Sequence, residues 1–358
     1  MRLVTQRSLL FMVLLALTCG CGERDSTNSK TEVTAAPSVE LPQAKIFTGP
    51  TKTGCFCVAV SSDGSLLAAG YGGREPPYSI DCPVSGCVYV WSIKTQKVKC
   101  ILRGHTEIVS SVDFSSDGRF LLSGSQDGST RLWNIESGKE IRVVEQLHPA
   151  APVTAIFMPD GKSILTANGG EGPMKGVGAY DVESGKMSGR FSKDTGDVAV
   201  NGDGSVVVTA SGWAHVWEGM TGTKKTTFKA PGTIWQVALS PDGNTLVTGN
   251  SEGVVSVHNL ATGSVEHRAL HSEEATGKNL NSVESVAISR DGVWGASAGY
   301  GRICVWRLSD NETHFWDTDN WVQDVTFGPT GNTVYAGSRD GQVVTLTPPN
   351  KAIDSDTK

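Results

Sequence analysis

One stretch of the sequence, Gly104 to Asn134, recurs in weaker copies along most of the chain from residue 50 to residue 348. Such repeats constrain the fold more than any other sequence feature, because each copy must form the same small unit. Apolar and polar residues alternate within the stretch, and glycine-containing turns interrupt the alternation, as expected for short β-strands. The predicted strands are residues 108–114, 120–125, the segment that ends at Trp133, and 140–145. Each copy therefore predicts one four-stranded antiparallel sheet.

The number of sheets follows from a turn that each copy carries between its first two strands. This turn is an Asp-Gly pair at Asp63, Asp117, Asp160, Asp203, Asp242 and Asp291, and Thr330-Gly331 takes its place in the last copy. These turns predict seven sheets. The 42 glycines among 358 residues also suit an all-β protein that is dense in turns.

The spacing from the Gly-His pair at residue 104 to the Trp-Asn pair at residue 133 resembles the WD40 family of β-propellers. The resemblance implies an all-β fold of seven four-stranded antiparallel blades arranged as a ring. In that family four side chains clamp a blade internally, and here they fall on His105, Ser123, Asp127 and Trp133, with Ser125 as an alternative to Ser123. A series of hydrogen bonds from carboxylate to imidazole, from imidazole to hydroxyl and from hydroxyl to indole would satisfy every polar group in the clamp. We expect a complete clamp only in the second blade.

The ends of the repeat region predict how the ring closes. The last blade has only three strands of its own before Pro348 and Pro349, so it would leave an unpaired edge. Residues 44–47 precede the first blade and can supply the missing outer strand, as N-terminal strands do in other propellers. We therefore assign residues 44–349 to the propeller and residues 350–358 to a polar tail.

The first residues have the composition of a targeting segment rather than of folded structure. Arg2 and Arg7 flank a short apolar run, and residues 1–21 resemble a bacterial lipoprotein signal that is cleaved before Cys21. Cys19 is the alternative lipidation site, and an ordinary secretory signal is the alternative to lipidation. Residues 22–43 are rich in Ser, Thr, Glu and Pro and predict a flexible tether. We expect an exported lipoprotein on the periplasmic side of the outer membrane, held to the membrane by its lipid only.

Three insertions lengthen the repeats, at residues 71–86, 168–175 and 271–281. The order of strands in a blade places all three on one face, where long loops on a rigid scaffold often carry function. Neutral drift at tolerant loop tips is the alternative explanation. A Cys82–Cys87 disulfide is predicted to stiffen the first insertion. The candidate partner-binding residues in the insertions are Tyr71, Arg74, Tyr78, Asp81, His271, Glu273 and Lys278.

Charge and residue pattern exclude several classes of function. The net charge is -6 and no run of Lys or Arg occurs, which argues against a nucleic-acid partner. Cys55 and Cys57 lie two apart on one strand, but no His or Cys stands near them in sequence to complete a metal site, so we predict neither metal nor cofactor. The clamp residues could be mistaken for a Ser/His/Asp catalytic site, yet a repeat scaffold explains them better. Trp213 and Trp235 are predicted to pack in the core or between blades.

These observations predict a non-enzymatic, monomeric propeller that docks a protein partner through its loop-inserted face. The alternative is a small-molecule-binding or hydrolytic propeller with its site at the central channel. The two differ in whether polar side chains converge at the channel mouth or packed residues plug it.

Overall fold

The computed structural model describes residues 45–50, 53–73, 86–146, 153–168, 176–192, 196–268, 270–271, 282–309 and 312–348. All of them belong to one compact unit, Ala36–Lys358. The predicted signal segment, most of the tether and the C-terminal tail lie outside the described residues. The structure of the described part is built almost wholly of strands, and its helix η1 (Gly219–Thr221) is a single 3-10 turn. No helix in this part of the chain combines the length and the apolar character needed to cross a membrane.

Five sheets each contain four antiparallel strands in sequence order. The first has β2 (Gly54–Val60), β3 (Leu66–Gly72), β4 (Gly86–Ser92) and β5 (Val98–Arg103). The second has β6 (Val109–Phe114), β7 (Phe120–Ser125), β8 (Ser129–Asn134) and β9 (Lys139–Gln146). The third has β10 (Val153–Phe157), β11 (Ser163–Asn168), β12 (Gly176–Asp181) and β13 (Met187–Ser192). The fourth has β14 (Asp197–Val200), β15 (Val206–Ser211), β16 (Trp213–Glu218) and β17 (Thr223–Phe228), and the fifth has β18 (Ile234–Leu239), β19 (Thr245–Asn250), β20 (Val255–Asn259) and β21 (Val265–Arg268).

The remaining strands form one six-stranded sheet in the order β1-β26-β25-β24-β23-β22. Its strands are β22 (Val283–Ile288), β23 (Trp294–Arg307), β24 (Thr313–Phe327), β25 (Val334–Ser338), β26 (Gln342–Leu346) and β1 (Ile46–Thr48). The prediction of seven blades is therefore wrong in its count, since the described residues form six sheets. The reason is β24, whose 15 residues pair with β23 at one end and with β25 at the other. The predicted sixth and seventh blades are thus continuous with each other.

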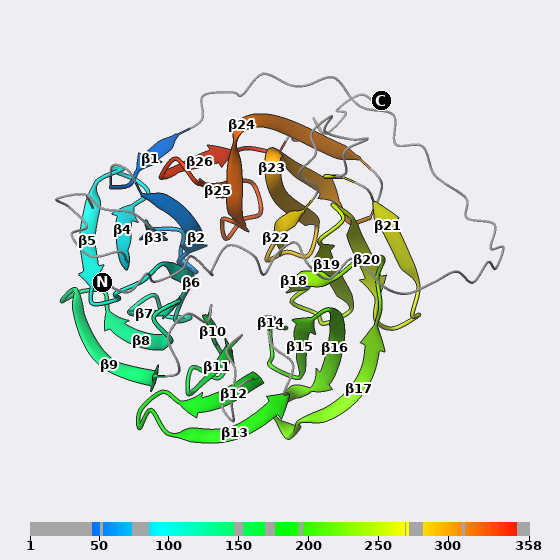
Figure 1. Ribbon diagram of the computed structural model, residues 1–358, viewed down its shortest axis with the longest axis horizontal. Helices are drawn as coiled ribbons and strands as arrows, with labels where there is room; N and C mark the ends of the chain where they lie inside the picture. Colours follow the sequence, from blue (N-terminus) through cyan, green and yellow to red (C-terminus); the bar gives the residue numbers. More distant parts are fainter. Residues whose placement is uncertain are drawn as a thin grey trace, which may run out of the picture. The chain divides into compact units, whose positions relative to one another are not determined.

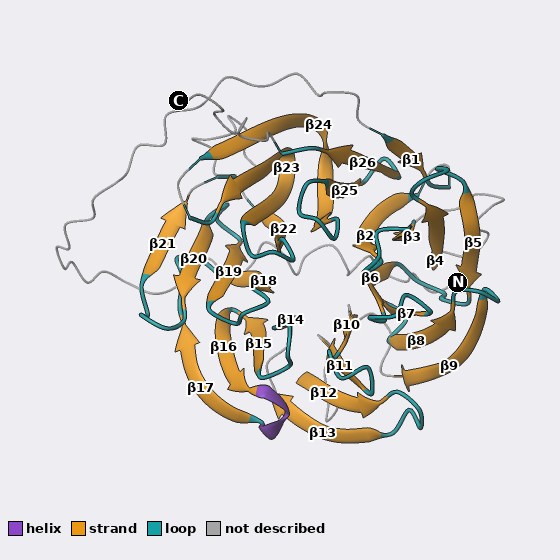
Figure 2. Ribbon diagram, turned by 180° about the vertical axis from the view of Figure 1, so that it is seen from behind, coloured by secondary structure: helices purple, strands orange, loops and turns teal. Residues whose placement is uncertain are grey.

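The innermost strands meet side by side in a closed circle. Contacts run from β2 through β6, β10, β14, β18 and β22 to the second half of β24, and β24 returns to β2. Figures 1 and 2 show the sheets arranged radially around these strands. The apolar core accordingly lies between neighbouring sheets; one cluster combines Cys57 and Leu102 of the first sheet with Phe114 and Trp133 of the second.

The N-terminal strand lies at the outer edge of the six-stranded sheet. Ile46 of β1 is opposite Val344 of β26 in an antiparallel pair. The N–H of Lys45 donates to Thr345 Oγ1 at 2.9 Å, and the N–H of Thr345 donates to the Lys45 carbonyl at 3.0 Å. The segment predicted to cover this edge therefore does so.

The Asp-Gly turns share one local structure. Gly118 has a φ of 68°, in the left-handed region where a side chain would be strained, and the matching glycines of the other copies have similar values. Ser115 Oγ donates to Asp117 Oδ1 at 2.6 Å and accepts the N–H of Phe120 at 3.0 Å. The side chain thus pairs the end of one strand with the start of the next, which fixes the register of the hairpin.

Candidate functional site

The predicted clamp residues lie together inside the second sheet. His105 Nδ1 is 2.9 Å from Asp127 Oδ2, and His105 Nε2 is 2.7 Å from Ser123 Oγ. The indole N–H of Trp133 donates to Ser123 Oγ at 2.8 Å. Ser123 is 0% exposed and His105 1% exposed, so no substrate can reach this serine. The chain of hydrogen bonds lowers the pKa of Asp127 well below its usual range. The arrangement fits a structural role rather than catalysis.

Other sheets contain fragments of the same clamp. In the fourth sheet, the Trp217 indole N–H donates to Thr209 Oγ1 at 3.0 Å. In the six-stranded sheet, His271 Nε2 is 2.9 Å from Ser297 Oγ. His271 was predicted to contact a partner, and this is wrong, because the residue is only 1% exposed and burial lowers its pKa to about 3. Its position before an innermost strand, like that of His105, is the signal that identifies it as a clamp residue.

The first predicted insertion gives a second correction. Tyr71 was predicted to bind a partner, but it is 0% exposed, and its ring packs edge-on against Tyr89 with centroids 5.5 Å apart. Tyr71 belongs to the end of β3 rather than to a loop, which is why its side chain turns into the core. Cys87 is disulfide-bonded, and its predicted partner Cys82 lies outside the described residues. The other candidates outside the described residues are Arg74, Tyr78, Asp81, Glu273, Lys278 and the lipidation candidate Cys21.

The cysteine pair on β2 has the properties of core residues. Cys55 and Cys57 are both free and buried, and the Cys57 thiol donates to the Val109 carbonyl at 3.5 Å. Burial raises the pKa of both thiols, which disfavours the thiolate that a metal requires. Among the described residues, no three His, Cys, Asp or Glu side chains come together as a metal site.

Three aspartates connect innermost strands of neighbouring sheets. Each accepts a backbone N–H from the next innermost strand: Asp113 from Phe157 at 2.7 Å, Asp197 from Val237 at 3.1 Å, and Asp324 from Val58 at 2.7 Å. The surrounding strands partly bury these aspartates, and the desolvation raises the pKa of Asp113 and of Asp197 to about 7. For Asp324 it raises the pKa to about 6.

Relative to the unaltered chain, the Asp113→Asn variant is expected to be more stable at high pH than at low pH. The folded protein holds the proton up to a pKa of about 7 and the unfolded chain only up to 3.8, so the contribution of Asp113 to stability declines as the pH rises between these values. Asparagine does not titrate and keeps an oxygen that can accept the Phe157 N–H. Urea unfolding at about pH 5 and about pH 8 measures the change.

Asp117→Asn is the matched control for this pH dependence. The pKa of Asp117 is lowered by the hydrogen bond from Ser115, so the stability that its charge contributes is lost only below the unfolded value of 3.8. Its effect should therefore be the same at both pH values. An Asp113→Asn effect that is also equal at both would show that Asp113 has no raised pKa.

Two tryptophans that we predicted to pack in the core or between blades are exposed. Trp213 and Trp235 are each 48% exposed, and Lys229 Nζ lies 4.3 Å from the centroid of the Trp213 ring. Each follows one partner of an isolated β-bridge in which Gly212 and Ile234 exchange two backbone hydrogen bonds of 3.1 and 3.0 Å. Trp213 begins β16, the third strand of its sheet, and Trp235 lies at the start of β18, the first strand of the next sheet. Both strands begin on the face of the predicted insertions, so both tryptophans lie on that face. The sequence signal that could have predicted this exposure is the position of each tryptophan at the start of a strand, next to a loop.

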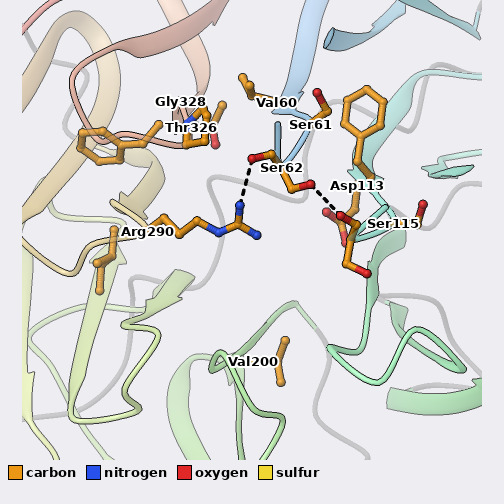
Figure 3. Close-up of a pocket in the computed structure, with 14 residues that line it drawn as sticks. Val60, Ser61, Ser62, Asp113, Ser115, Val200, Arg290, Thr326 and Gly328 are labelled. Carbon is orange, nitrogen blue, oxygen red and sulfur yellow. Dashed lines mark hydrogen bonds between the residues drawn. The ribbon is translucent and has the colours of Figure 1, made fainter. Parts of the chain in front are cut away.

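A cavity of about 410 Å³ opens at the ends of the innermost strands, on the side of the ring opposite to Trp213 and Trp235. Its wall includes the last residues of several innermost strands, and its rim consists of Asp-Gly turns or their neighbours. In Figure 3 the side chain of Arg290 reaches toward the middle of this mouth. The wall residues at strand ends are Val60, Phe114, Val200, Ile288 and Phe327, and the rim residues include Ser62, Ser116, Arg290 and Pro329. Polar groups therefore converge at this mouth, which lies on the face opposite to the insertions.

Four segments of the chain match a family of known repeats. The WD40 family, described as "WD domain, G-beta repeat", matches residues 42–92, 96–134, 222–259 and 310–344. The chain carries WD40 repeats. The second matched WD40 segment holds the complete clamp from His105 to Trp133, and the structure confirms the predicted propeller architecture with four-stranded blades.

Several curated proteins are similar to this chain over part of their own length. The Periodic tryptophan protein 2 homolog of Dictyostelium discoideum is 35% identical over 123 residues, 34% of this chain and 12% of the relative. The Pre-rRNA-processing protein crb3/ipi3 of Schizosaccharomyces pombe is 24% identical over 290 residues, 81% of this chain and 54% of the relative. Protein tipD of Dictyostelium discoideum is 25% identical over 271 residues, 72% of this chain and 40% of the relative. The chain thus spans 54% or less of each of these relatives.

These relatives contradict the predicted location. They are eukaryotic proteins, and the one that covers 81% of this chain is a pre-rRNA-processing protein. The prediction of a bacterial lipoprotein exported to the periplasmic side of an outer membrane is therefore wrong. It rested on residues 1–21 alone, whose charge and apolar run are a compositional signal and lie outside the described residues.

Proposed function

We propose that this chain is a non-enzymatic scaffold that docks a protein partner through the face bearing Trp213 and Trp235. The observation that carries the proposal is the exposure of both indoles, because tryptophan is enriched among the residues that dominate binding energy at protein interfaces. WD40 propellers are typical protein-interaction scaffolds, which supports the same conclusion. The acidic net charge of -6 favours a protein over a nucleic acid as the partner.

The geometry of the exposed pair supports docking rather than incidental exposure. Strand pairing between Gly212 and Ile234 fixes the backbone next to both tryptophans, so little conformational entropy remains to be lost when a partner covers them. Lys229 covers part of the Trp213 ring and offers a positive charge beside it. The proposed partner surface is therefore an apolar pocket or groove with an acidic rim.

The double variant Trp213→Ala/Trp235→Ala is expected to weaken partner binding at least tenfold, since an interface tryptophan commonly contributes about 2 kcal/mol or more. The measurement starts from a photo-crosslinking amino acid at position 213, which identifies the partner in cells. Binding of the purified partner is then measured by calorimetry.

The double variant Val98→Ala/Ile141→Ala is the matched control, because it removes two apolar side chains that are 45% and 41% exposed on the outer strands β5 and β9. It should leave affinity unchanged. A partner whose affinity is the same for both double variants would exclude this face as the docking site.

A further inference from the structure

We propose that the cavity at the channel mouth opposite the docking face binds a small organic carboxylate, with Arg290 as its ion-pair partner. The cavity holds about 410 Å³, within the range of small-molecule sites. It is formed at the ends of innermost strands from several sheets, so the folded ring builds it as a whole. This proposal is independent of the docking face described above.

Arg290 is held over the mouth by a short chain of hydrogen bonds between turns. Its Nη1 group donates to the Ser62 carbonyl at 3.1 Å, and Ser62 Oγ donates to the Ser116 carbonyl at 2.6 Å. The turns that these residues come from belong to three different sheets. A guanidinium has five N–H donors, so this contact leaves donors for a ligand. Figure 3 shows the guanidinium directed into the mouth beside Ser62.

The lining, which is mostly polar, offers a carboxylate one basic partner and a smaller stretch of apolar wall. Arg290 is the single basic residue of the lining, and the planar guanidinium matches a carboxylate through two parallel hydrogen bonds. Val60, Val200 and Phe327 offer apolar wall to the rest of such a molecule. One basic group matches one acidic group, which favours a monoanion over a polyphosphate.

Three other polar side chains of the lining are already engaged. Ser61 Oγ donates to Asp63 and Ser115 Oγ donates to Asp117, each at 2.6 Å. Asp113 is the single acid of the lining; it accepts the N–H of Phe157, and burial raises its pKa to about 7. It therefore opposes a bound anion less than an ordinary ionised aspartate would.

The test is ligand-observed NMR of the full chain with acetate, butyrate, benzoate and 3-phenylpropionate as probes. We expect saturable binding that increases with the size of the apolar body, and no binding of the uncharged analogue 3-phenylpropionamide. Arg290→Gln should weaken the bound acids about tenfold or more, because it removes a charged hydrogen-bond donor.

Arg119→Gln is the matched control, since Arg119 is an exposed arginine in an Asp-Gly turn of the same face and does not line the cavity. It should bind the probes as the unaltered chain does. Circular dichroism and thermal unfolding establish that both variants are folded, and Trp213→Ala/Trp235→Ala should also retain probe binding. Equal affinity in Arg290→Gln and Arg119→Gln, or no binding of any acid, would overturn the proposal.

Discussion

Replacing Phe47 by alanine is expected to lower the free energy of unfolding by about 3–5 kcal/mol, the usual cost of removing a buried phenylalanine. Phe47 is the central residue of β1 and is 2% exposed. Its ring packs edge-on against Trp91 of the first sheet, with centroids 5.9 Å apart, in a core cluster that also includes Tyr335 and Val343 of the last sheet. One side chain on the N-terminal strand therefore joins the two sheets between which the ring closes.

Ile46→Ala is the control on the same strand, because Ile46 is 50% exposed and points away from this cluster. Its effect should stay within about 0.5 kcal/mol. Urea unfolding followed by tryptophan fluorescence measures both variants. Deletion of residues 44–49 should cost more than Phe47→Ala, since it also exposes the edge of β26. An unchanged melting temperature after this deletion would show that β1 does not hold the ring closed.

Sequence patterns predicted the features that depend on neighbours along the chain. The Asp-Gly turns are determined by local conformation: only a glycine adopts a φ near 70° without strain, so Gly118 and its counterparts mark each hairpin. The clamp from His105 to Trp133 followed from the resemblance to WD40 repeats, and all four of its residues lie within one repeat. The N-terminal strand followed from counting strands at the last edge.

Features that depend on contacts between distant segments were missed. The count of blades was wrong at β24, where residues 313–327 continue as one strand from one predicted blade into the next. This segment contains no glycine or proline, and that lack of a turn residue could have predicted the continuous strand. Arg290 and Ser62 meet only because the ring closes, and no sequence spacing encodes that contact. The bridge between Gly212 and Ile234, next to the exposed tryptophans, joins two separate sheets and likewise follows from no spacing within one repeat.

Replacing Ser123 by alanine is expected to lower the free energy of unfolding by about 2–6 kcal/mol. The hydroxyl group pairs with both the His105 ring and the Trp133 indole, and it is fully buried. Its removal leaves two buried polar groups without a partner, and each such group costs about 1–3 kcal/mol. The measurement is denaturant unfolding at neutral pH, with Ser137→Ala in an exposed turn of the same sheet as the control for serine removal.

Thr209→Val provides the sharper comparison, because Thr209 accepts one indole N–H, from Trp217, in a sheet that lacks the clamp histidine. Only one buried donor then loses its partner, so the expected cost is about 1–3 kcal/mol. If Ser123→Ala costs about twice as much as Thr209→Val, the clamp acts as a connected chain whose central hydroxyl satisfies two groups. Equal costs would instead mean that His105 loses nothing when its Nε2 is left without the Ser123 hydroxyl, and that the imidazole is held by Asp127 rather than by Ser123.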